Sequence, residues 1–166
     1  MSRFFMSEFV YAAVRCGLAM VFLYSGVMKL ADLGAFASVI EAYGIVPWEF
    51  KSLSALVISL AEVFAGAGLL LDVRGSLTAV AVMLVVFMAV LGLGIHMGYD
   101  IDCGCFGEDD PVGKAMHGLG RALIRDLVFT AGVLYCYVWR YLHSHEPAGL
   151  ATYFYHLVNG KKRRSL

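Results

Sequence analysis

Four long apolar stretches constrain the fold of this sequence more than any other feature. They run over residues 10–30, 53–71, 77–98 and 119–142. A helix needs roughly 20 apolar residues to cross the hydrocarbon core of a bilayer. Each stretch has about this length, so we predict an all-α integral membrane protein built as a bundle of four transmembrane helices.

The composition favours the same class of protein. Of the 166 residues, 60% are hydrophobic and 16% are charged. Soluble domains are usually about 45–50% apolar and about a quarter charged. A short soluble chain could not hide this much apolar surface, because small domains have a high surface-to-volume ratio. We therefore expect the lipid bilayer as the main partner. The formal net charge of zero indicates no nucleic-acid partner.

We expect a single membrane domain over residues 1–142 and a basic tail over residues 143–166. The first apolar stretch exceeds the ~7–15 residues of a signal-peptide core, so we expect it to be retained. Within the tail, residues 150–158 are apolar and aromatic but too short to span, and residues 161–164 are all basic. This combination predicts a short helix on the cytoplasmic surface that contacts anionic lipid.

The basic residues indicate the orientation of the four spans. An even number of spans brings the N-terminus, the second loop (72–76) and the tail to one side. That side carries Arg3, Arg74, Arg140, Lys161, Lys162, Arg163 and Arg164. Because basic flanks face the cytoplasm, we predict a multi-pass protein of the bacterial inner membrane with both termini cytoplasmic. The first loop (31–52) and the third loop (99–118) then face the periplasm.

The third loop contains two cysteines one residue apart, Cys103 and Cys105, within the run Asp-Cys-Gly-Cys-Phe-Gly. Gly104 relaxes the backbone, so the two sulfurs can close a small, strained ring. Strained, exposed disulfides exchange with thiols more readily than structural ones, and disulfides persist in the periplasm. This pattern makes Cys103 and Cys105 candidate catalytic residues.

Spacing alone leaves three alternatives for these cysteines. They form a redox-active pair that exchanges with a partner protein, or a soft-metal site, or a disulfide that only pins the loop. Thiolates and thioethers suit Cu(I), and potential further ligands flank the loop at His96, Met97, Met116 and His117. We expect the redox pair and no bound metal.

A second group of candidate residues is charged and lies within the spans. An ionisable residue at the centre of a span costs a few kcal/mol and usually has a partner or a function. Glu62 lies at the middle of the second stretch, and we predict that it faces the bundle interior and pairs with Arg15 or Arg125. Such a pair either fixes helix register alone, or forms a polar site that binds a quinone headgroup or relays protons. The candidate cofactor-binding residues are Arg15, Glu62, Arg121 and Arg125.

The spans also contain glycines at positions where helix backbones can approach one another closely. These are Gly17, Gly26, Gly66, Gly68, Gly92, Gly94 and Gly132. The alternative is that they only fill space, and the sequence does not separate the two.

Several of these features together resemble a known family. The runs 15–18 and 22–26, the pair Lys29-Leu30, Glu62 with its following glycines, the Cys103–Cys105 motif, and Arg121 with Arg125-Asp126 resemble the MauE branch of the DoxX-like membrane proteins, named for methylamine utilisation. The resemblance covers about residues 10–139. It implies a four-helix bacterial membrane protein that acts with a thioredoxin-like partner in forming disulfides in periplasmic proteins. DoxX-like relatives add an implied link to quinone as electron acceptor.

The predicted function follows from the cysteines and the resemblance. We expect a membrane thiol–disulfide oxidoreductase, or its accessory, that exchanges electrons between Cys103–Cys105 and a periplasmic thioredoxin-like protein, with quinone as the candidate cofactor. The first loop has no cysteine, so exchange has to pass directly between this pair and the partner. The alternative is a soft-metal or small-substrate transporter, or an assembly factor, that uses the same cysteines.

Overall fold

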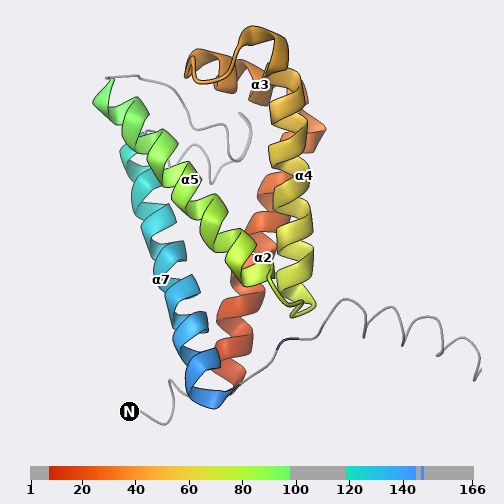
Figure 1. The fold of residues 1–166 in the computed structure, drawn as a ribbon, viewed down its shortest axis with the longest axis vertical. Coiled ribbons are helices and arrows are strands. Elements are labelled where there is room, and N and C mark those ends of the chain that lie inside the picture. Colours follow the sequence, from red (N-terminus) through yellow and green to blue (C-terminus); the bar gives the residue numbers. More distant parts are fainter. Residues whose placement is uncertain (1–7, 98–118, 145–146, 148–166) are drawn as a thin grey trace, which may run out of the picture.

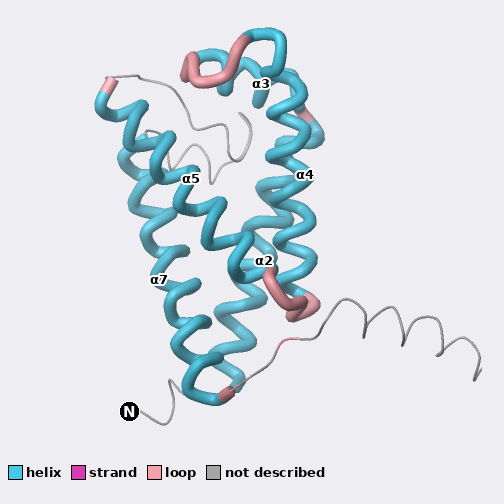
Figure 2. Tube along the Cα trace, viewed as in Figure 1, coloured by secondary structure: helices cyan, strands magenta, loops and turns pink. Residues whose placement is uncertain are grey.

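The computed structural model describes residues 8–97, 119–144 and 147, and it is helical throughout apart from short turns (Figure 1, Figure 2). The four long helices are α2 (Glu8–Ala31), α4 (Lys51–Leu70), α5 (Ser76–His96) and α7 (Leu119–His143). Each is long and apolar enough to cross a bilayer, and no strand occurs in the described ranges. The predicted fold class is confirmed: the chain is a multi-pass, all-α membrane protein.

The long helices alternate in direction along the bundle (Figure 1). A tight turn over residues 71–75 joins α4 to α5, and it lies near the start of α2 and the end of α7; we call this the turn end. The end of α2, the start of α4, the end of α5 and the start of α7 lie at the opposite end, with the short helix α3 (Leu33–Ala42). We call this the α3 end. Residues 98–118, which include Cys103 and Cys105, follow α5 and precede α7 in the sequence.

Helices α2 and α4 pack closely because glycine faces backbone across their interface. A Cβ on Gly26 would lie 2.9 Å from the carbonyl oxygen of Ser59, and one on Gly66 would lie 2.9 Å from the amide nitrogen of Leu23. Such distances leave no room for a side chain. Small residues allow this approach in membranes, where packing rather than the hydrophobic effect holds helices together.

Not every glycine in the spans serves this purpose. Gly94 is also tightly enclosed, because a Cβ there would lie 2.5 Å from Leu119 Cδ2 and 2.8 Å from Tyr43 Cε1. A Cβ on Gly17 or Gly92 would meet nothing within 4 Å. Some of the glycines in the spans therefore allow close packing of helices, and others do not.

The first loop has secondary structure that the sequence patterns did not predict. It contains α3 and a short 3-10 helix, η1 (Trp48–Phe50). The Asp32 side chain caps α3 by accepting a hydrogen bond from the amide of Ala35 at 2.9 Å, and such caps stabilise helix starts. Phe36 and Ala37 pack against Ala55 of α4. At ten residues, α3 is too short to span a bilayer, so a search for spans passes over it.

Outside the core, the long helices expose many apolar side chains. Val82, Val85 and Val86 on α5 and Leu127 and Val128 on α7 are each more than half exposed. In water such a surface would promote aggregation. In a bilayer it contacts lipid chains, as expected for spanning helices.

Candidate functional site

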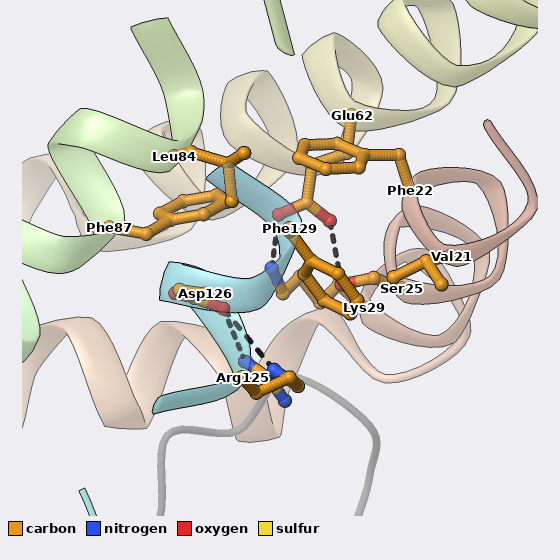
Figure 3. A pocket seen from close by; sticks show the side chains of 10 residues that line it. All are labelled: Val21, Phe22, Ser25, Lys29, Glu62, Leu84, Phe87, Arg125, Asp126 and Phe129. Atoms are coloured by element: carbon orange, nitrogen blue, oxygen red, sulfur yellow. Dashed lines mark hydrogen bonds and ion pairs between the residues drawn. The ribbon is translucent and has the colours of Figure 1, made fainter. Parts of the chain in front are cut away.

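The centre of the candidate site is the carboxylate of Glu62, which α4 directs towards α2. The residue is 1% exposed. One carboxylate oxygen, Oε2, accepts a hydrogen bond from Ser25 Oγ at 3.0 Å, and the other, Oε1, accepts from Lys29 Nζ in an ion pair. The prediction that Glu62 faces the bundle interior agrees with this geometry. Figure 3 shows both α2 side chains pointing at the carboxylate.

The cationic partner in this pair is a lysine, which corrects the expectation of Arg15 or Arg125. Lys29 lies in the last turn of α2 and is 3% exposed. Its ammonium lies 4.8 Å from the ring centroids of both Phe36 and Phe87, so aromatic faces add to its stabilisation. In the sequence, Lys29 lies at the end of the first apolar stretch (10–30), and it was not among the candidate partners of Glu62. A usable signal was the spacing of Ser25 and Lys29, which puts both on one helix face.

A second ion pair adjoins the first. Asp126 on α7 is 3% exposed, and its Oδ1 accepts hydrogen bonds from Nε and Nη2 of Arg125, both at 3.2 Å. The two pairs together hold two positive and two negative charges. Opposite charges are the condition under which ionisable groups are tolerated at membrane depth.

A small cavity connects these groups in the α3 half of the bundle (Figure 3). Its volume is about 20 Å³, and its lining comprises Val21, Phe22, Ser25, Lys29, Glu62, Leu84, Phe87, Arg125, Asp126 and Phe129. All four long helices contribute to it. A cavity has to provide roughly 10–15 Å³ to hold one water molecule. This cavity therefore has room for about one water beside both ion pairs.

Arg15, the first candidate cofactor residue, belongs to a different cluster at the turn end. Its Nη1 donates to the carbonyl oxygens of Leu69 and Leu70, which end α4, and lies 4.0 Å from the carboxylate of Asp72. Arginine therefore satisfies carbonyls that have no partner within the helix. The structure does not bring Arg15 together with Glu62.

The rest of this turn-end cluster was not predicted from the sequence. Asp72 accepts from Arg140 Nη2 and from the hydroxyl of Tyr11 at 3.2 Å, and Arg140 Nε donates to the same hydroxyl at 2.9 Å. The Tyr11 ring stacks on Trp139 with centroids 4.1 Å apart. The cluster ties the 71–75 turn to the start of α2 and the end of α7.

Arg121 and Arg125 lie one turn apart near the start of α7. Both border a hollow of about 280 Å³ together with Ile124, Val128 and Phe129. Arg125 and Phe129 also line the small cavity, so the hollow and the cavity are neighbours. Three of the four candidate cofactor residues, Glu62, Arg121 and Arg125, therefore lie in one region. The candidate catalytic residues, Cys103 and Cys105, lie outside the described residues.

Comparisons with known proteins identify the family of this chain. The model of the family described as methylamine utilisation protein MauE matches residues 7–139. This chain belongs to the MauE family. The methylamine utilization protein MauE of Paracoccus denitrificans is 30% identical over 136 residues, which cover 79% of this chain and 70% of that protein. No solved structure matches.

The MauE match covers the residues that build the site. It begins before α2 and ends within α7, so it includes both ion pairs, the cavity and the two cysteines. The resemblance seen in the sequence is confirmed at the level of the family. The family match also includes Tyr11 and Trp139 at the turn end, and it ends just before Arg140.

Proposed function

We propose that this MauE-family protein is a membrane thiol–disulfide oxidoreductase, or the accessory of one, in which Cys103 and Cys105 form a reversible disulfide that exchanges with an extracytoplasmic thioredoxin-like protein. The observation that supports the proposal is the position of the buried charge cluster. It lies in the half of the bundle where α5 ends and α7 begins, and the two cysteines occur in the sequence between those helices.

The exchange balances without a further reactant. A thiolate of the partner attacks the Cys103–Cys105 bond, a mixed disulfide forms, and the other cysteine leaves as a thiolate that takes a proton. The partner's second thiolate then breaks the mixed disulfide. In total, two electrons and two protons pass from the partner's dithiol to the pair. The same steps run in reverse when a reduced pair meets an oxidised partner.

The proposal includes an orientation. The basic flanks of the turn end and the tail favour the cytoplasm, so the α3 end faces the periplasm, where disulfides persist. An impermeant thiol reagent applied to intact spheroplasts should label the reduced cysteine pair. Labelling that requires a breached membrane would reverse the orientation.

A quinone is the electron carrier that the family resemblance implies, but the buried cluster does not fit one. The cavity of about 20 Å³ beside Glu62 accommodates about one water, which is far less than an aromatic ring. Arg15 contacts the end of α4 instead. We therefore derive no step through a quinone at Glu62, and we assign the exposed Arg121 to holding the partner against the bundle.

The name of the Paracoccus denitrificans relative connects that protein with methylamine utilization. We extend this connection to the present chain. The proteins that ultimately receive disulfides through the partner are then extracytoplasmic components of methylamine utilisation.

Single cysteine substitutions test the proposal. A C-x-x-C protein of the thioredoxin fold, with its second active-site cysteine changed to Ser, serves as the trapping probe. Cys103→Ser and Cys105→Ser should differ in the mixed disulfide that they accumulate, because one sulfur attacks and the other resolves. Cys136→Ser is the matched control, since Cys136 is buried in α7 and should leave trapping unchanged.

Two outcomes would overturn the proposal. Full exchange activity in both single variants would return the pair to a structural role. Stoichiometric copper that depends on both cysteines, without mixed disulfide, would establish the soft-metal alternative.

A further inference from the structure

We infer that the small cavity is a water-mediated proton relay, in which one water molecule joins the Lys29–Glu62 pair to Asp126. The inference deepens the proposed function, because it assigns Lys29 and Asp126 a part in handling the protons of the thiol exchange. The water site itself rests on geometry alone.

The size of the cavity and its lining favour water as the occupant. The volume of about 20 Å³ exceeds the roughly 10–15 Å³ that one water requires, and a buried water needs two to four polar partners. Ser25, Lys29, Glu62, Arg125 and Asp126 all line the cavity. Cavities lined only by apolar groups stay dry, whereas half of the residues that line this one are polar or charged.

The hydrogen-bonding capacity of two residues makes the bridge specific. Lysine carries three N–H donors, and an ionised carboxylate has about four acceptor positions. Lys29 donates to Glu62 Oε1, and Oδ1 of Asp126 accepts from Arg125. Both groups therefore have capacity for a water between them. Such a water accepts from Lys29 and donates to Asp126, which turns two ion pairs on three helices into one network.

The network allows a proton to move without a net charge leaving the bundle. When the water donates a proton to Asp126, Lys29 donates one to the water, so Lys29 and Asp126 both become neutral, and the reverse transfer restores the first state. During thiol exchange, protonated Asp126 releases a proton to balance the one that a leaving thiolate takes, and Lys29 regains a proton from solvent. The hollow bordered by Arg121, Arg125 and Phe129 adjoins the cavity.

A double-mutant cycle tests the water-mediated link in the purified resting protein. Glu62→Gln, Asp126→Asn and the double variant are compared by thermal unfolding in detergent. We expect the loss of melting temperature in the double variant to be clearly smaller than the sum of the single losses, because coupled residues are not additive. Glu62→Gln combined with Asp72→Asn is the control, and it should be additive because Asp72 lies at the turn end.

Val21→Leu then separates a water bridge from a direct interaction. Val21 lines the cavity, and one added methylene takes up the space of the water without altering a polar group. We expect this substitution to abolish the non-additivity. Non-additivity that persists at full size, or strictly additive single losses, would overturn the water bridge.

A spectroscopic measurement keeps the test independent of variant stability. The wild-type protein in D₂O should show an infrared O–D stretching band of a strongly hydrogen-bonded internal water, and Val21→Leu should lack it. Absence of the band from the wild type would also overturn the inference. Neither experiment involves the cysteines, so failure here is distinguishable from failure of the proposed exchange.

Proton transfer has its own readout. The rate at which the mixed disulfide is resolved should show a solvent deuterium isotope effect in the wild type. Asp126→Asn and Val21→Leu should both lose this effect, and Asp72→Asn should keep it. An isotope effect that is unchanged in both cavity variants would leave the water in a structural role and refute the relay.

Discussion

The two ends of the bundle both hold buried charge, but they stabilise it differently. At the turn end, the carboxylate of Asp72 is 20% exposed and lies within 4.0 Å of two arginines. In the α3 half, the side chains of Lys29 and Glu62 are 2% and 1% exposed, and they line a cavity. The turn end is a redundant clamp at the edge of the membrane. The α3 half is a largely buried network in which each charge depends on its partner.

The difference has a physical cause. Near the interface, a charged group that loses one partner still finds water or a second ion. Inside the bundle bulk water is excluded, so a charge that loses its partner costs several kcal/mol.

The largest expected effect comes from breaking the deep pair. Lys29→Met keeps the length of the side chain but removes the cation beside Glu62. We expect a loss of about 3–5 kcal/mol in the free energy of unfolding, because a buried charge remains uncompensated. Unfolding in detergent micelles measures it. Adding Glu62→Gln to Lys29→Met should recover most of the loss, and a single variant as stable as the wild type would contradict the dependence of Glu62 on Lys29.

A smaller effect is expected at the α2–α4 interface, beside the deep pair. A Cβ on Gly26 would lie 2.7 Å from Val63 Cγ2 and 2.9 Å from a backbone oxygen, so Gly26→Ala should cost about 1–3 kcal/mol by overpacking. Gly17→Ala is the matched control in the same helix, because a Cβ there meets nothing within 4 Å. It should be neutral or slightly stabilising. Equal effects at both positions would refute the close approach.

The turn end should tolerate the loss of one cation better. Arg140→Met removes the hydrogen bonds to Asp72 and Tyr11, but Arg15 remains near the same carboxylate. We expect a loss of about 1–2 kcal/mol, at the low end for hydrogen bonds to charged groups, because Arg15 still lies beside the carboxylate. Arg74→Met, at an exposed position of the same turn, is the control. If Arg140→Met proves as costly as Lys29→Met, the clamp is not redundant.

The smallest effect on stability is expected at Arg121. The residue is exposed on α7, so Arg121→Gln should change the free energy of unfolding by less than about 0.5 kcal/mol. Exchange with the partner should nevertheless slow by roughly tenfold at low salt, because a charge at the edge of an interface governs association. Arg74→Gln, at the opposite end, should leave the rate unchanged. Identical rates in both variants would remove Arg121 from the partner surface.

Sequence patterns anticipated most of the scaffold. The length of the apolar stretches predicted the four spanning helices to within a few residues at each end, because a bilayer imposes one length on every helix that crosses it. The same criterion missed α3, which is held by the Asp32 cap and by Phe36 packing on α4. A helix of that length depends on contacts between elements, and a local pattern does not record them.

The candidate site was only partly predictable. A carboxylate in the middle of an apolar stretch marked Glu62 as a buried residue with a partner, because the cost of a charge in lipid follows from the sequence position alone. Which cation pairs with Glu62 depends on the rotation of α2 about its own axis relative to α4. Gly26 and Gly66 let the two backbones meet, and this contact turns Lys29 rather than Arg15 towards the carboxylate.

The sequence by itself thus determined the class of protein, the number of spans and the residues too costly to leave unpaired. Those properties follow from composition, length and the free energy of transferring charge into lipid. The tertiary structure alone decided that Arg15 caps α4, that Lys29 pairs with Glu62, and that a cavity the size of one water lies beside Asp126. Those outcomes depend on the rotation and spacing of neighbouring helices, which packing between side chains sets and no single stretch of sequence contains.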